Sequence, residues 1–411
     1  MRIYLHRKDE RNTFEIFALC ALIFLPSINN FINSILQLGM GMNTTGLTET
    51  VYVFMLILSL WGFLRNCINN NKLLLFSGLL LVLMLVSYII YPEIRPDIYG
   101  DPIDLIYNPI NVTTFFCIPM MFIASSIQDY GKLFAGMLKW SVLTVILGVI
   151  TLWQCVFVAG ETLQYMVFSY AILTSICVCF EGFFLEKKKR YLICGILGFI
   201  SMFMCGARGA VLAFLIYIVL RVVFFNPTTN NGTRITVLGI SIVVLIITLL
   251  FYDNIVFGID ALLDSIGIES RFLERLIEGS LLEDRSRSEL SSMFVEAIKH
   301  NPFGYGAFGD RYITYAFGRA GGATYLHNLF LELICDFGLF IGPIIIIVLI
   351  YNLFKSLFSK RDAAITRVLW CLVPCGFIQL MFSGSFWTLK EFWVIIVILY
   401  GSAKLRRERE F

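Results

Sequence analysis

The chain contains 411 residues, of which 58% are hydrophobic and only 15% are charged. Soluble domains contain about 45–50% apolar and about 25% charged residues, so this composition excludes a soluble protein and indicates an integral membrane protein. A transmembrane barrel would show short alternating segments, whereas the apolar runs here are long and continuous, so the sequence predicts helices. The net charge of +3 gives no reason to expect a nucleic-acid partner.

A transmembrane helix needs about 20 mostly apolar residues. Windows of that length predict an all-α polytopic membrane protein, with about 12 transmembrane helices in a single domain covering residues 1–411. The apolar run near the N-terminus is interrupted by Pro26 and lacks a small-residue cleavage site, so an uncleaved first helix is expected. The predicted helices cover residues 14–33, 47–64, 73–91, 111–127, 137–158, 163–184, 191–206, 209–225, 235–252, 332–354, 368–385 and 391–403.

Basic residues divide the connections between these helices into two sets. One set carries most Lys and Arg residues, in segments 2–11, 65–72, 132–139, 187–190, 221–234, 355–367 and 404–409. The opposite short connections carry only Arg95, Arg208 and Lys390. By the positive-inside rule, the first set and both termini are expected to be cytoplasmic, and the second set to face the outside.

The longest polar segment, residues 253–331, is expected on the external face, and long loops in compact proteins usually serve a function. Within it, Ser286 and Glu289 have the spacing of a helix capping box, and Pro302 predicts the end of that helix. The segment 270–284 repeats the apolar periodicity, so two or three amphipathic helices are expected on the outer rim. The apolar face of residues 285–300 consists of Leu290, Met293, Phe294, Ala297 and Ile298.

Three arginines are candidates for binding an anion. Arg287 and Arg285 lie at the start of the 285–300 helix, where a guanidinium beside free backbone N–H groups favours an anion site. A surface ion pair of Arg287 with Glu283 or Asp284 is the alternative. Arg208 is the sole charge between two predicted transmembrane helices, where an ionisable group is costly, so a functional role is favoured over snorkelling to the interface.

The chain has only three histidines. His6 lies in the cytoplasmic tail, and His300 suits the C-terminal end of an amphipathic helix. His327 is followed by Asn328 where the external loop re-enters the membrane, so it is either an ordinary interfacial residue or a reactive group. Glu332 and Asp336 fall on one helical face four residues apart, which favours the reactive group. No nucleotide-binding or metal-binding motif is present, and no cofactor or metal is expected.

Three segments, CGARGAVLAF, SRSELSSMFVEAIKHNPFGYGAF and LHNLFLELICDFGLFIG, occur in an order and spacing that resemble the Wzy/O-antigen ligase superfamily. The resemblance covers residues 187–345 and implies a fold of the lipid-linked glycosyltransferase (GT-C-like) type, without metal dependence. It implies that Arg208 and Arg287 hold the pyrophosphate of an undecaprenyl-linked glycan donor. It also implies that His327, paired with Asn328 in the binding site, activates or orients the acceptor hydroxyl. From its place on the same helix, Glu332 is expected to orient His327.

Three functions are considered for this chain: a polymerase, a ligase and a transporter. HNLFLEL followed by DFGLFIG is more similar to polymerases of O-antigen or capsular repeat units than to ligases, which transfer the finished glycan to lipid A core. The expected location is the bacterial inner membrane, with the active site on the periplasmic face. The expected partners are the lipid-linked donor, the lipid-linked acceptor and the bilayer. A chain-length regulator is a further candidate partner. An anion transporter remains a different alternative, although no inverted repeat is visible in the sequence.

Overall fold

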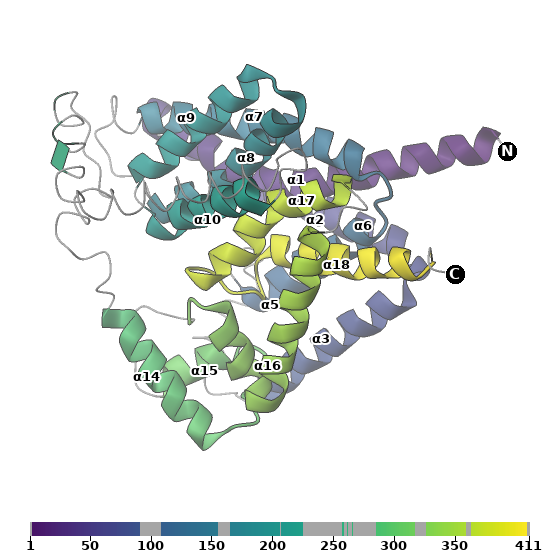
Figure 1. Cartoon of the computed structure of the whole chain (residues 1–411), viewed down its shortest axis with the longest axis vertical. Helices are drawn as coiled ribbons and strands as arrows, with labels where there is room; N and C mark the ends of the chain where they lie inside the picture. The colour runs from purple at the N-terminus through teal and green to yellow at the C-terminus, as the bar shows by residue number, and fades with distance from the viewer. Residues whose placement is uncertain are drawn as a thin grey trace. The chain divides into compact units, whose positions relative to one another are not determined.

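The computed structural model describes residues 2–90, 108–154, 165–205, 207–224, 257–258, 261, 265, 285–316, 326–358 and 363–408. Within these ranges the regular structure is helical and contains no strand (Figure 1). In the part of the chain that the structure describes, seven helices are long and apolar enough to cross a membrane. The prediction of an all-α polytopic membrane protein is therefore confirmed.

The described residues form a succession of helices. Those long enough to span a membrane comprise Asn12–Met40, Thr45–Asn66, Asn71–Ile90, Tyr130–Gln154, Val167–Glu186, Leu329–Leu357 and Ala363–Met381. The labelled helices are α1 (Arg2–Met40), α2 (Thr45–Asn66), α3 (Asn71–Ile90), α5 (Pro109–Val112), α6 (Ile118–Ser125), α7 (Tyr130–Gln154), α8 (Tyr165–Glu186), α9 (Lys189–Cys205), α10 (Arg208–Phe224), α14 (Arg285–His300), α15 (Gly309–Ala316), α16 (Leu329–Leu357), α17 (Ala363–Val373) and α18 (Lys390–Glu408). Two π-helical segments, Thr113–Cys117 and Pro374–Ile378, and two 3₁₀ turns, Cys67–Asn69 and Gln379–Met381, join some of them.

The predicted transmembrane segments correspond closely to these helices. The segments at 191–206 and 209–225 form α9 and α10, which are shorter than the seven longest candidates. The predicted segment 391–403 lies within α18, whereas 235–252 lies outside the described residues. The exact number of membrane crossings therefore stays a prediction.

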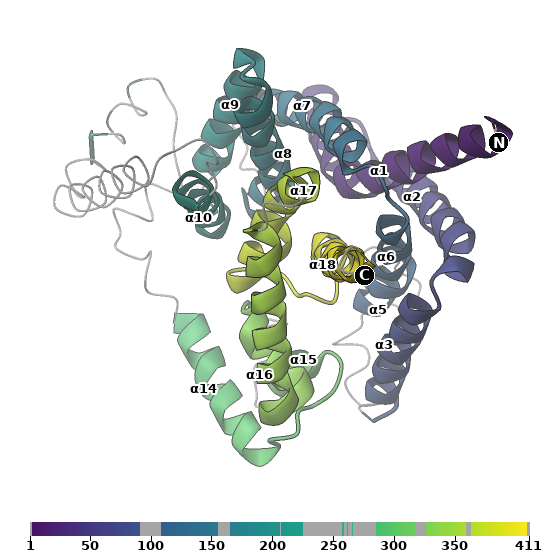
Figure 2. The same cartoon turned by 45° about the vertical axis from the view of Figure 1, so that its right-hand side comes forward.

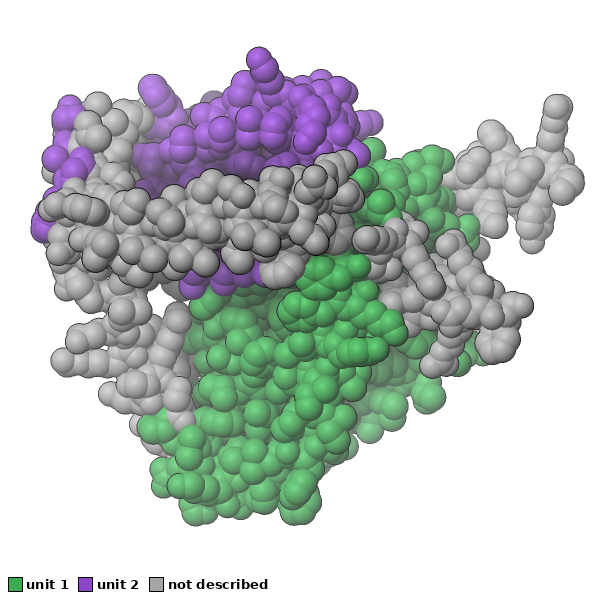
Figure 3. All heavy atoms as spheres, viewed as in Figure 1, with its two compact units in different colours: residues 1–25, 49–136, 285–411 green, residues 26–48, 137–284 purple. Residues whose placement is uncertain are grey.

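The chain divides into two compact units (Figure 3). Unit 1 contains residues 1–25, 49–136 and 285–411, and unit 2 contains residues 26–48 and 137–284. The organisation of the whole chain as one polytopic membrane domain stays a prediction.

In unit 2, α8 lies alongside α9 and also contacts α10 (Figure 2). A buried ion pair connects α8 to α10. The Arg221 guanidinium contacts the Glu181 carboxylate through Nε at 2.5 Å and Nη2 at 3.2 Å, and the Tyr217 hydroxyl donates to the same carboxylate at 3.0 Å. The Glu181 side chain is only 1% exposed. Its charge is thus balanced by a guanidinium rather than by water, and this pair holds α10 against α8.

Replacing Glu181 with glutamine is expected to lower the free energy of unfolding by about 3–5 kcal/mol, because it leaves a buried guanidinium without its counter-charge. The measurement is thermal unfolding of the purified protein in detergent. Glu186→Gln is the matched control, since its ion pair with Lys188 is largely exposed and worth only about 0–1 kcal/mol. Equal effects of the two substitutions would contradict the proposed contribution of the buried pair.

In unit 1, α14, α15 and the first part of α16 lie side by side in both cartoon views (Figures 1 and 2). The predicted amphipathic helix is confirmed as α14, which begins one residue before the expected cap Ser286 and ends at His300. Its predicted apolar face is buried at Phe294, Ala297 and Ile298, whereas Lys299 on the opposite face is exposed. The other predicted amphipathic segment, 270–284, lies outside the described residues.

The core between these three helices is a small apolar cluster. It joins Phe294, Ala297 and Ile298 of α14 to Ile313 of α15, to Leu326 and to Cys335 of α16. Part of the long predicted loop is therefore a packed structure on α16. Residues 326–328 lead directly into that helix, and residues 302–306 lie against its residues 335–339.

Candidate active site

The predicted His-Asn pair stands directly before α16. Asn328 is the N-cap, and its Oδ1 accepts hydrogen bonds from the backbone N–H groups of Phe330 at 3.0 Å and Leu331 at 3.2 Å. This use of Oδ1 satisfies two of the N–H groups that a helix start leaves without an intrahelical partner. His327 is half-buried and has a φ of 53°, in the left-handed region that few non-glycine residues occupy. Such a conformation persists where the surrounding structure holds it in place.

Asp310 holds the residue that precedes His327. Its Oδ2 accepts a hydrogen bond from the backbone N–H of Leu326 at 3.1 Å, while its Oδ1 accepts one from the N–H of Arg311 at 2.9 Å. Asp310 is fully buried in the first turn of α15. One carboxylate therefore connects the start of α15 to the backbone next to His327.

Two further buried carboxylates project from α16 toward the segment that joins α17 to α18. Glu332 accepts hydrogen bonds from the Ser385 hydroxyl and from the backbone N–H of Phe386. Asp336 accepts from the indole N–H of Trp387 at 2.7 Å and from the backbone N–H of Gly309 at 2.9 Å. The predicted shared face of Glu332 and Asp336 is confirmed, and it binds the 385–387 segment to α16.

Aromatic side chains surround the 385–387 segment. The Trp387 ring is fully buried, with centroid distances of 5.0 Å to Phe308 and 4.9 Å to Phe386. The Trp387 carbonyl accepts hydrogen bonds from the Thr113 hydroxyl at 2.8 Å and from the Trp393 indole at 3.3 Å. These ring contacts and hydrogen bonds hold in place the segment whose groups bind Glu332 and Asp336.

The backbone of residues 302–306 is inserted into a kink of α16. Gly338 has non-helical angles (φ 75°, ψ 176°). The carbonyls of Cys335 and Asp336 accept hydrogen bonds from the N–H groups of Tyr305 at 2.8 Å and Gly306 at 3.0 Å, and the Leu339 N–H donates to the Pro302 carbonyl at 2.8 Å. The loop therefore satisfies backbone groups that the kink has removed from the helical pattern.

Three carboxyl groups thus lie near one another, and Asp310 interacts electrostatically with both Glu332 and Asp336. Burial raises the pKa of Asp310 above its ordinary value, and the neighbouring Arg311 guanidinium and the backbone N–H groups oppose that shift. Among the residues that the structure describes, no group of His, Cys, Asp and Glu side chains is arranged to hold a metal ion. Here the carboxyl oxygens instead accept hydrogen bonds from N–H and O–H donors.

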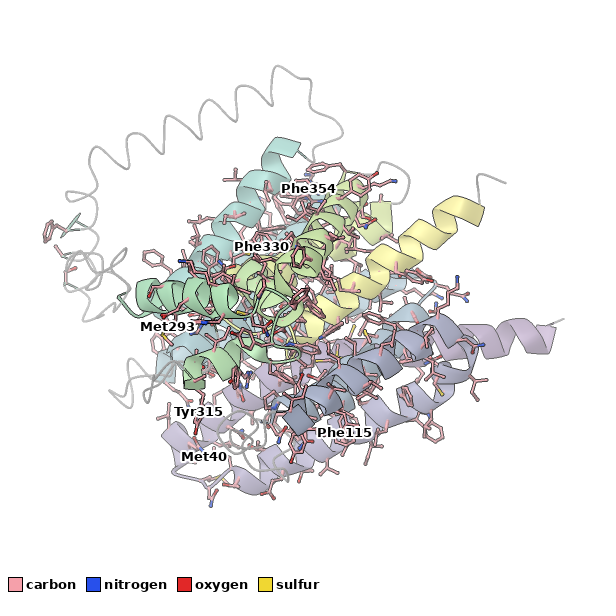
Figure 4. The ribbon with its side chains drawn as sticks, turned by 90° about the horizontal axis from the view of Figure 1, so that it is seen from below. Met40, Phe115, Met293, Tyr315, Phe330 and Phe354 are labelled. Carbon is pink, nitrogen blue, oxygen red and sulfur yellow. The ribbon has the colours of Figure 1, made fainter. Side chains whose placement is uncertain are left out.

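The structure brings three of the predicted site residues, His327, Asn328 and Glu332, together at the start of α16 (Figure 4, which labels Phe330 on the same turn). Arg208 is the first residue of α10 in unit 2, and Arg285 and Arg287 occupy the first turn of α14 in unit 1. The side chains of these three arginines lie outside the described part of the chain. Their approach to His327 stays a prediction.

Sequence reasoning missed Asp310 and the 385–387 segment. Asp310 follows a glycine-rich stretch that was expected only to end α14, and α15 was not predicted. The one available signal was an acidic residue at the start of a short amphipathic run, GDRYITYA, which favours the first turn of a helix. No local pattern marks Ser385 or Trp387, because their partners lie more than 50 residues away in the sequence.

The chain was compared with protein families, curated proteins and solved structures. Residues 193–347 match a family model described as O-antigen ligase, a stretch that runs from α9 to the middle of α16. No curated protein and no solved structure matches the chain. Members of the matched family are membrane glycosyltransferase-like enzymes, either polymerases or ligases. Over this stretch, which is less than half of its 411 residues, the chain is similar to the O-antigen ligase family.

Proposed function

We propose that this protein polymerises undecaprenyl-pyrophosphate-linked oligosaccharide repeat units into O-antigen or capsular polysaccharide. The observation that most supports this proposal is the position of His327 within the matched region. A half-buried imidazole is held in a left-handed backbone conformation, between an anchored Leu326 and a helix cap, directly before a membrane-length helix. A histidine that merely lies at the membrane interface, with no catalytic role, would not need its backbone held in this way.

The proposed reaction is a single inverting displacement. The acceptor hydroxyl oxygen forms a bond to the anomeric carbon of the donor sugar, while the bond from that carbon to the pyrophosphate oxygen breaks. The hydroxyl proton passes to the His327 imidazole, and the bonding electron pair leaves with undecaprenyl pyrophosphate. A neutral imidazole is suited to accept that proton near neutral pH.

The remaining site residues have distinct proposed roles. Arg208 and Arg287, with Arg285 beside the latter, are proposed to bind the pyrophosphate, because paired guanidinium contacts stabilise the charge that develops on the leaving group. Glu332, on the first turn of α16, is proposed to orient His327. Asn328 uses Oδ1 for its cap, so its proposed contact with the acceptor would come from the Nδ2 group.

The proposed setting is the bacterial inner membrane, with both termini cytoplasmic and the site on the periplasmic face. The lipid-linked donor and acceptor would reach this face from the outer leaflet, and a chain-length regulator is a proposed protein partner. A ligase that transfers finished glycan to lipid A core is the second candidate, favoured by the description of the matched family.

Replacing Arg287 with alanine is expected to leave surface glycan as single repeat units, seen as loss of the ladder on a gel of surface polysaccharide from complemented cells. The physical reason is the loss of a guanidinium at the leaving group, which typically costs about 10²–10³ in rate. Lys299→Ala is the matched control, since Lys299 is an exposed cation on the same helix and should keep the ladder.

Other outcomes of this experiment discriminate between the candidates. Long chains that accumulate on the lipid carrier in the Arg287→Ala strain would indicate a ligase. Normal chain length and attachment, with reduced uptake of an anion, would overturn the enzyme proposal altogether. Protein levels in the membrane fraction must match the parent for either result to count.

A further inference from the structure

The three buried carboxylates of the site do different structural tasks. Glu332 and Asp336 both bind groups of the 385–387 segment, and Asp336 also binds the Gly309 N–H. Asp310 instead binds the backbone of Leu326, one residue from His327. Of these three acids, Asp310 is therefore the one whose hydrogen bond lies nearest to His327 along the backbone.

The chemistry of Asp310 suits it to fix that backbone. Its two oxygens accept from N–H groups 15 residues apart in the sequence, on Arg311 and on Leu326. An asparagine of the same shape has one acceptor oxygen and an NH₂ group, so it could satisfy one N–H and would oppose the other. A buried carboxylate is costly, and a neutral apolar residue would suffice if the position served only to fill space.

His327 needs this support because of its backbone conformation. Leu326 is also seated in the apolar cluster between α14, α15 and α16, and Asn328 is fixed as the α16 cap. The left-handed φ of 53° is thus held from both neighbours. Loss of the Leu326 hydrogen bond would free one of these two attachments and allow the peptide to return toward negative φ.

We infer that Asp310 is the positioning residue for His327, acting through its hydrogen bond to the Leu326 N–H. This inference rests on the proposed function for its catalytic consequence, since a misplaced imidazole would be poorly aimed at the acceptor hydroxyl. Its structural part, that Asp310 sets the environment of the His327 ring, stands independently of the reaction.

The test uses the full chain with His6→Gln and His300→Gln, so that His327 is the sole histidine and its ring resonance can be followed by NMR in detergent micelles. Asp310→Asn should shift or broaden that resonance, and turnover of a lipid-linked repeat unit should fall on the order of 100-fold with little change in KM. Asp336→Asn is the matched control, because it removes the same kind of acceptor without touching residues 326–328.

Asp310→Ser provides a second variant if Asp310→Asn does not fold. Its smaller side chain cannot reach the Leu326 N–H, so it should also shift or broaden the His327 signal. Equal changes in that signal with Asp336→Asn, or an unchanged signal with Asp310→Asn and Asp310→Ser, would overturn the inference. Failure of the proposed function would appear differently, as full polymerisation by His327→Ala alongside an altered histidine signal in Asp310→Asn.

Discussion

Replacing His327 with alanine is expected to lower the rate of glycan polymerisation by about 10²–10⁴-fold, the range that a general base contributes to catalysis. Cells that carry only this variant should display single repeat units and lose the polysaccharide ladder. The physical reason is that the acceptor hydroxyl would keep its proton as it approaches the anomeric carbon. The measurement is the chain-length distribution of surface glycan, with membrane levels of the variant matched to the parent.

The matched control is His300→Ala. His300 is exposed at the C-terminal end of α14, where it serves the helix end, so its loss should leave chain length unchanged. His327→Gln separates the two roles considered for this residue, because glutamine can donate a hydrogen bond but cannot act as a base at neutral pH. A retained ladder in His327→Gln would assign His327 to orienting the acceptor, and a retained ladder in His327→Ala would remove it from the mechanism.

The amphipathic helix α14 could be predicted almost to the residue because its signal is local. Apolar residues at helical spacing specify which face is buried, and Phe294, Ala297 and Ile298 lie in the cluster beneath it. Pro302, after the last turn, specifies the end. The start of α16 was predicted three residues too late, at 332, because the N-cap role of Asn328 before the apolar run was not recognised.

The support for His327 could not be predicted, because it depends on contacts that no local pattern encodes. Asp310 reaches Leu326 across 16 residues, and Ser385 reaches Glu332 across 53. The sequence showed that Glu332 and Asp336 would share a face, but it could not show what that face would contact. Their partners, a hydroxyl, an indole and backbone N–H groups, have no charge that would complement the acids in a sequence pattern.

Gly338 and Gly304 show a second reason why the structure could not be predicted fully from the sequence. Read along the sequence, Gly338 is one small residue inside a long apolar helix, and Gly304 is one of several loop glycines. The structure joins them: a side chain added to Gly304 would lie 2.5 Å from the Gly338 nitrogen. Two backbones approach here at a distance that only glycine permits.

Replacing Gly338 with alanine is therefore expected to abolish folding or to lower the yield of folded protein severely. The angles φ 75° and ψ 176° lie in a region essentially restricted to glycine, where another residue costs about 1–3 kcal/mol. In addition, the new methyl group would lie 2.6 Å from the carbonyl oxygens of both Pro302 and Phe303. Because those oxygens belong to backbone that is hydrogen-bonded into the kink, neither segment can move away without breaking the pairing with Cys335, Asp336 and Leu339.

The measurement is the size-exclusion profile and thermal unfolding of the detergent-solubilised variant. Gly78→Ala in α3 is the matched control, since a Cβ there meets nothing within 4 Å and alanine should favour that helix by about 0.5–1 kcal/mol. A Gly338→Ala protein as stable as Gly78→Ala would show that the kink and the inserted loop do not form as described. If Gly338→Ala folds partly, cells that carry it should also lose the polysaccharide ladder. The kink supports the turn of α16 that carries Glu332, and this turn follows His327.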